Sequence, residues 1–103
     1  MKTYEVGDKV AWVSQSQGTW TKKVGVITHV IPDDTFLNRV VNFSYYRKNF
    51  SPRVNLAEAN KRKGISYLVA VPQPSVEAKW LLYWPQTRKL EDAGGAELGT
   101  TTF

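Results

Sequence analysis

Residues 4–12 read YEVGDKVAW. The Gly-Asp pair supplies a turn, and the alternation after it, with Val10 and Trp12 on one face, is the period of two expected of a β-strand. Near the other end of the chain, residues 66–71 read SYLVAV and residues 79–85 read KWLLYWP. A turn-launched strand followed later by a hairpin that closes on an aromatic-Pro step predicts a small antiparallel β-barrel. Such barrels more often bind a partner than catalyse a reaction.

The second expected strand, residues 22–31, is apolar in part on both faces. A strand of this kind can bend and serve two sheets. Gly25 is the expected site of the bend or of a close approach between backbones, because it has no Cβ. A turn at residues 72–75 joins the last two strands, and Pro85 ends their pairing because it has no backbone N–H. The expected strands are residues 8–13, 22–31, 65–71 and 76–84, with an extra one over residues 40–46.

The same alternation predicts which side chains are buried. One face of each strand turns to the core, and a shift of one residue in register would exchange the two faces. The residues expected in the core are Val10, Val26, Leu68, Ala70 and Leu82, together with at least part of Trp12 or Trp84.

The middle of the chain, residues 33–64, has no single period and is expected to be an insertion in the barrel. One short helix is predicted within it, over residues 56–63. Asn55 can cap the start of this helix, and Glu58 can reach back to the backbone of Asn55. Gly64 is a suitable residue to end it.

At 103 residues the chain is expected to be one domain, which spans residues 1–92. Residues 86–90 predict one helical turn or a short last strand. The Gly/Thr-rich tail, residues 93–103, is expected to be disordered. The chain has no cysteine, which excludes disulfides and thiolate metal sites. It has neither a membrane-length apolar run nor a signal peptide, so a cytoplasmic protein without a membrane partner is expected.

The order of strand, polar loop, longer strand, variable excursion and closing hairpin resembles the Src-homology-3-like small barrels, including KOW and Tudor-like modules. It is also similar to small bacterial and phage proteins of unassigned function. The resemblance implies a fold that hosts many binding functions, so it points to a binding module without naming the partner. It rests on residues 6–10 (VGDKV), 24–27 (VGVI) and 67–71 (YLVAV).

Catalysis is not expected. The two ends of the chain also resemble the plasmid-borne type II dihydrofolate reductase, but Leu82 stands where that family has a glutamine and cannot hydrogen-bond a substrate or cofactor. His29 is the single histidine and has no acid near it in sequence, as a general base would need. Asp33 and Asp34 follow a proline and read as a turn. We therefore expect no enzyme activity, no metal and no cofactor.

The net charge of +5 favours polyanionic partners. Half of the cations lie between residues 38 and 64, against one acid, Glu58, and aromatic residues lie among them. Cations neutralise phosphates and aromatic rings stack on bases, so this segment predicts a nucleic-acid site. It can equally be a solvated excursion whose aromatics dock on the barrel. The candidate binding residues are Arg39, Tyr45, Tyr46, Arg47, Lys48, Arg53, Lys61, Arg62 and Lys63, with Trp20 as an exposed ring in the polar loop.

Two hypotheses remain open from the sequence. The first is a non-catalytic barrel that binds DNA or RNA through the basic insertion. The second is a protein-interaction barrel, such as an accessory or inhibitor from a phage or mobile element that docks on a host protein complex. The second hypothesis rests on the same residues, because Tyr and Arg are also favoured at the centres of protein interfaces.

Overall fold

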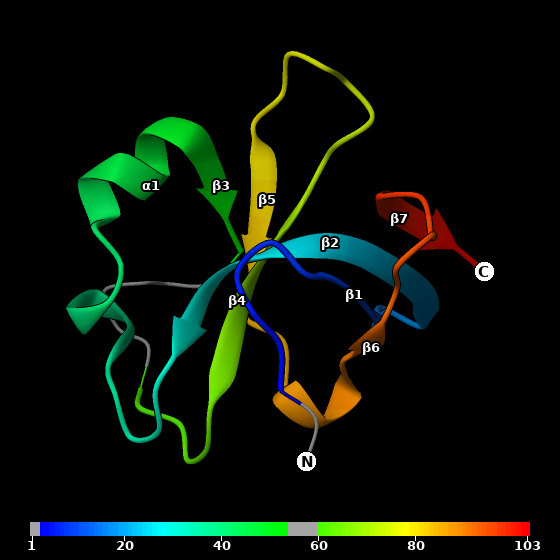
Figure 1. The fold of residues 1–103 in the computed structure, drawn as a ribbon. Coiled ribbons are helices and arrows are strands. Elements are labelled where there is room, and N and C mark those ends of the chain that lie inside the picture. Colours follow the sequence, from blue (N-terminus) through cyan, green and yellow to red (C-terminus); the bar gives the residue numbers. More distant parts are fainter. Residues whose placement is uncertain (1–2, 54–59) are drawn as a thin grey trace.

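The computed structural model describes residues 3–53 and 60–103, which form a mainly β fold with one short α-helix (Figure 1). The mainly β class and the presence of one short helix are confirmed. The strands are β1 (Lys9–Ser16), β2 (Thr19–Ile31), β3 (Phe50–Pro52), β4 (Ser66–Val71), β5 (Trp80–Tyr83), β6 (Glu91–Asp92) and β7 (Gly99–Thr102). The helices are α1 (Phe43–Asn49) and the single 3₁₀ turns η1 (Leu37–Arg39) and η2 (Thr87–Lys89).

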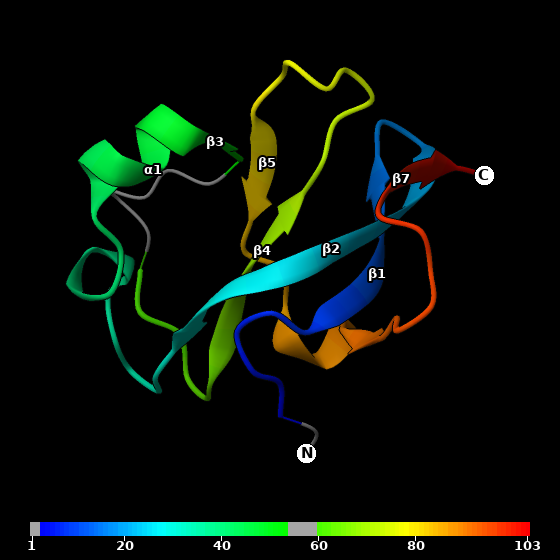
Figure 2. The same ribbon diagram turned by 45° about the horizontal axis from the view of Figure 1, so that its top comes forward.

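The seven strands belong to one sheet of order β3-β5-β4-β2-β1-β6, and β7 pairs with β2 beside this path. Every pairing is antiparallel except that of β3 with β5. Among the strands that the structure describes, no pairing joins β3 to β6, so the sheet is open and the expected barrel is not closed by hydrogen bonds. Figures 1 and 2 show α1 and β3 beside β5, and β7 beyond β2 on the other side.

β1 and β2 form a longer hairpin than the alternation predicts. Gln17 and Gly18 have φ angles of 51° and 82°, and two successive left-handed residues form the hairpin turn whose twist matches that of the strands. The pairing therefore continues to Ser16 and Thr19. Most of the segment expected to be a polar loop, residues 14–19, therefore belongs to the two strands, and Gln17 and Gly18 form the turn between them.

β2 bends, as the sequence predicts, but it pairs in two places along one edge of a single sheet and does not serve two sheets. Its first half, residues 21–24, pairs with β7, and its second half pairs with β4. Gly25 lies between the two pairings. A Cβ on this residue would be 2.5 Å from the Ala70 carbonyl oxygen and 2.7 Å from Val69 Cγ1. The close backbone approach expected at Gly25 is confirmed.

A β-bulge between Ile27 and His29 changes which face β2 presents. In a regular strand Ile27 and Ile31 would share a face, because side chains repeat every two residues. The extra residue shifts this alternation. Ile27 therefore packs in one core cluster and Ile31 in another.

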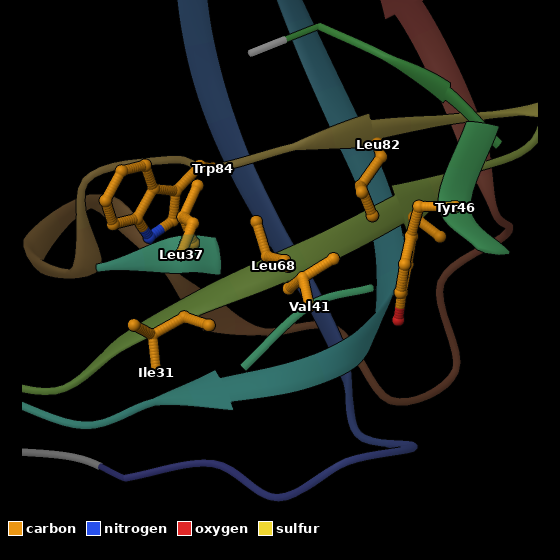
Figure 3. Close-up of a cluster of buried hydrophobic side chains, with 8 residues drawn as sticks. Ile31, Leu37, Val41, Tyr46, Leu68, Leu82 and Trp84 are labelled. Carbon is orange, nitrogen blue, oxygen red and sulfur yellow. The ribbon is translucent and has the colours of Figure 1, made fainter. Parts of the chain in front are cut away.

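The two faces of the sheet carry separate cores. We call the first the inner core; it consists of Tyr4, Val10, Trp12, Ile27, Tyr67, Val69 and Val71. The second, which we call the helix-side core, consists of Ile31, Leu37, Val41, Tyr46, Leu68, Ala70, Leu82 and Trp84. Figure 3 shows residues of the insertion lying against β4 and β5 in the helix-side core, so the insertion packs on the sheet.

The predicted core is confirmed except at one position. Val10, Leu68, Ala70 and Leu82 are buried, as are both tryptophans. Val26 is only half-buried. β2 comes closest to β4 at the neighbouring residue, Gly25. Val26 instead lines a shallow apolar depression on the helix side of the sheet.

The insertion differs from the prediction in its local structure. Residues 43–46 belong to α1 instead of a strand, because Asn42 caps the helix by accepting a hydrogen bond from the Tyr45 N–H at 3.1 Å. Helical spacing then brings the rings of Tyr46 and Phe50 together, stacked with centroids 5.1 Å apart. The helix predicted over residues 56–63 lies largely outside the described residues, and residues 60–63 are not helical.

The tail also differs from the expected disorder, because Gly99–Thr102 forms β7 on the edge of β2. Ala93 is buried with Val24 in a small cluster, and Leu98 packs against it. Glycine content alone predicts flexibility, but a free strand edge offers unpaired N–H and C=O groups, and the β-branched threonines suit a strand. In the described part of the chain, no helix has the length and apolar character needed to cross a membrane.

We predict that Gly25→Ala lowers the free energy of unfolding by about 1–3 kcal/mol, because the new methyl group forces β2 away from β4. Chemical denaturation measures this loss. Gly94→Ala is the matched control, since a Cβ there meets no atom within 4 Å. Equal stability of the two variants would show that β4 does not hold Gly25 in this way.

We predict that acid weakens the fold through His29. Its ring packs edge-on against Tyr46 at 5.0 Å and hydrogen-bonds the Tyr46 hydroxyl, and burial lowers the pKa of His29. Below about pH 6.5, His29 therefore takes up a proton more readily in the unfolded chain than in the native state. The free energy of unfolding falls as the pH drops through this range. Denaturation across this range should show a shallower pH dependence for His29→Gln. If His29→Gln keeps the same pH dependence of stability as the wild type, His29 is excluded as the cause of that dependence.

Candidate nucleic-acid interface

The cations of the insertion do not form one positive face. α1 leads into Phe50, which pairs with Trp80 at the start of β5, and Lys79 Nζ donates to the Arg47 carbonyl at 2.7 Å. Arg62 instead lies against Trp84, just beyond the end of β5. The predicted binding residues of α1 therefore lie at one end of β5 and residues 61–63 at the other. The remaining three are elsewhere: Arg39 in η1, Arg53 after β3 and Trp20 in β2.

The aromatic residues predicted to contact a ligand also fall into two groups, one exposed and one buried. Tyr45 is 58% exposed and Trp20 is 50% exposed, so each offers accessible surface to a ligand, although the Tyr45 ring also packs edge-on against Tyr46. Tyr46 is 4% exposed and belongs to the helix-side core. Its assignment as a contact residue is corrected: helical spacing turns its ring inward to His29 and Phe50.

Arg62 is held rigidly by the backbone of the closing hairpin. Its guanidinium donates to the Trp84 carbonyl at 2.9 Å and to the Pro85 carbonyl at 3.0 Å. It also lies 3.6 Å from the centre of the Trp84 ring. Burial lowers the pKa of Arg62, but a guanidinium stays protonated in proteins. Arg62 is thus a fixed positive charge that joins the insertion to the sheet.

The other cations of the insertion are exposed and differ in how far they are neutralised. Lys61 pairs with Asp34 at 3.3 Å and lies over the Phe36 ring. Lys63 makes no ion pair with any described residue. The remaining exposed cations are Arg39, Arg47, Lys48 and Arg53.

A groove of about 740 Å³ runs between residues 62–66 and residues 86–90. We call it the basic groove. The Thr87 hydroxyl connects its two walls by donating to the Ile65 carbonyl at 2.9 Å. The Tyr4 hydroxyl closes one side by donating to the Leu90 carbonyl at 3.2 Å. The residues that line the groove are Tyr4, Arg62, Lys63, Gly64, Ile65, Ser66, Gln86, Thr87, Arg88 and Leu90.

The basic groove carries three cations, Arg62, Lys63 and Arg88. None of the described residues that line it is acidic. Asp33 lies beside the groove and accepts a hydrogen bond from the Gly64 N–H at 2.5 Å. Concave sites of this size bind small molecules or single units of a polymer, and the charge selects an anion.

Sequence reasoning missed half of this groove. Arg88 and Gln86 belong to the wall around η2, and neither was among the candidate binding residues. Of the two alternatives expected for residues 86–90, a helical turn or a short last strand, the structure has the turn, η2 (Thr87–Lys89). The adjacent cations Arg88 and Lys89 were a signal, but nothing local indicates that they meet residues 62–63.

A second depression lies on the helix side of the sheet and is apolar. Its volume is about 390 Å³, and it lies between α1, β5 and the centre of β2. Trp80 forms one rim and is 37% exposed. The other lining residues are Val26, Thr28, Asn49, Phe50 and Ala70.

Comparison with known proteins identifies no relative. The chain matches no protein-family model, and it has no significant match among curated proteins or solved structures.

We predict that Arg62→Lys lowers the free energy of unfolding by about 1–3 kcal/mol although the charge is kept. Lysine loses the planar fork that reaches two carbonyls and stacks on Trp84. Thermal or chemical denaturation measures the loss, and Lys63→Gln is the control because the Lys63 side chain is exposed. A larger loss for Lys63→Gln than for Arg62→Lys would contradict the anchoring role of Arg62.

Proposed function

We propose that this protein is a non-catalytic domain that binds the sugar-phosphate backbone of a nucleic acid in the basic groove. The observation that carries the proposal is the meeting of Arg62, Lys63 and Arg88 in one concave site whose described lining includes no acid. Cations that neutralise phosphates release counterions, and this release dominates affinity for nucleic acids.

The three cations have different parts in this proposal. Arg62 cannot move far, because two carbonyls and the Trp84 ring hold it. A fixed guanidinium loses little conformational freedom when it meets a phosphate, and its geometry suits paired hydrogen bonds to phosphate oxygens. Lys63 and Arg88 are exposed and can adjust to the path of the backbone. Contacts of this type position a strand without reading its bases, so weak sequence preference is expected.

We predict that the double variant Lys63→Gln with Arg88→Gln binds oligonucleotides more weakly and with a flatter salt dependence. Each lost phosphate contact should reduce the slope of log K against log salt by roughly one unit. Fluorescence anisotropy with labelled random-sequence single-stranded DNA, RNA and duplex DNA, over a series of salt concentrations, measures this slope.

The matched control is Arg47→Gln with Lys48→Gln, which removes the same charge from α1 at the other end of β5. If the basic groove is the binding site, the slope of log K against log salt should change less for this control than for the groove variant. The reverse order would overturn the groove as the binding site and assign the interface to α1.

A protein-docking function is the second candidate, and the apolar depression beside the exposed Trp80 ring favours it. Aromatic rings in apolar pockets are frequent anchors of protein interfaces. No binding to DNA or RNA even at low salt would overturn the nucleic-acid proposal and leave this second candidate.

A further inference from the structure

Two more cations meet where the open sheet curls toward itself. The rings of Trp12 in β1 and Tyr83 in β5 contact edge to face at 5.5 Å, although β4 and β2 separate these strands along the sheet. Lys23 pairs with Trp12 across the β1–β2 hairpin, and its Nζ lies 5.4 Å from the centre of the Tyr83 ring. We call this place the seam.

Arg53 reaches the seam from the other side. It directly follows β3, and its N–H donates to the Leu82 carbonyl at 2.8 Å, which places it beside Tyr83. Its positive charge acts on Lys23: the pKa of Lys23 is lowered, first by burial and then by Arg53. The geometry agrees with this: β3 pairs with β5 in the register Pro52 to Leu82, so Arg53 follows beside Tyr83, over whose ring Lys23 lies.

The seam holds these charges without an acid. Lys23 Nζ donates to Ser14 Oγ at 2.6 Å and to Thr21 Oγ1 at 2.9 Å, which are neutral acceptors. Among the residues that the structure describes, neither Lys23 nor Arg53 forms an ion pair. A partly buried cation beside a second cation is unfavourable, and such arrangements concentrate at functional sites.

We propose that the seam is a phosphate-binding site in which Lys23 and Arg53 contact one phosphate group. The Ser14 and Thr21 hydroxyls hold Lys23 in place. Arg53, whose backbone is bonded to β5, would supply a planar guanidinium. A bound phosphate neutralises the like-charge pair and connects the β1–β2 hairpin to the β3–β5 edge. Its source is either a phosphodiester of a nucleic acid or a free phosphate.

This site is separate from the basic groove. Consecutive residues of a strand point to opposite faces. Tyr83, which faces the seam, packs on the inner core. Leu82 and Trp84 belong to the helix-side core, on the other face. Arg62 of the basic groove lies against the Trp84 ring and therefore on that other face. The seam proposal therefore does not rest on the proposed function of the groove.

The test is a titration of the full chain with inorganic phosphate and pyrophosphate, followed by thermal unfolding and by calorimetry, against chloride at matched ionic strength. We expect saturable binding and a rise in the melting temperature for the wild type. Lys23→Gln and Arg53→Gln should each weaken phosphate binding at least tenfold. Arg53→Gln should not melt below the wild type in chloride, because it removes one of two repelling charges.

Lys48→Gln serves as the control, because it removes one exposed charge from α1, away from the seam and the basic groove, and it should keep the phosphate response of the wild type. Arg53→Gln keeps the test valid if Lys23→Gln disturbs the hairpin, since the Arg53 side chain is exposed. An equal phosphate response in the wild type and both seam variants, or no saturable response in the wild type, would overturn the proposal.

An oligothymidine without terminal phosphates distinguishes the two sources. If the seam takes a phosphodiester, Arg53→Gln weakens oligothymidine binding and inorganic phosphate competes with it. If the seam takes free phosphate, the variant loses the phosphate response while oligothymidine binding is unchanged. Both results support a phosphate site and differ only in its ligand.

Discussion

The contact between Gly25 and β4 is the constraint on which the rest of this structure depends. Because residue 25 has no Cβ, β2 can approach Ala70 closely enough to pair with β4 and then turn away to pair with β7. The bulge that follows moves Ile31 to the opposite face from Ile27. One strand thus supplies both cores, which is how so short a chain buries apolar residues on both faces of a single sheet.

The curl that this strand imposes also explains where the cations are concentrated. Bending β2 brings the β1–β2 hairpin toward β5 without closing the sheet, so Lys23 lies over the Tyr83 ring of β5, next to the point where the Arg53 backbone is bonded to β5. At the end of β5, Arg62 joins the insertion to the closing hairpin and forms one wall of the basic groove. Both candidate anion sites therefore lie where distant segments are brought together, and neither is encoded in one stretch of sequence.

Arg62 and Tyr46 show why composition does not separate structural from binding residues. Both belong to the basic and aromatic segment that suggests a nucleic-acid site. In the fold, Arg62 anchors the insertion to Trp84 and Pro85, and Tyr46 packs in the core beside His29. Lys63, with the same charge as its neighbours, remains available to a ligand. The contribution of each residue depends on what its side chain meets across the fold.

The sequence by itself determined the mainly β class, the hairpin strands, most of the core and the close approach at Gly25. These follow from local rules: the period of two, the turn residues and the missing Cβ. Only the tertiary structure decided the open sheet, the ordered tail, the inward turn of Tyr46, and the meeting of Arg88 with Lys63 and of Lys23 with Arg53. Each of these depends on residues far apart in the chain, and their proximity is set by the bend in β2 and by packing of the insertion. No local pattern carries that information.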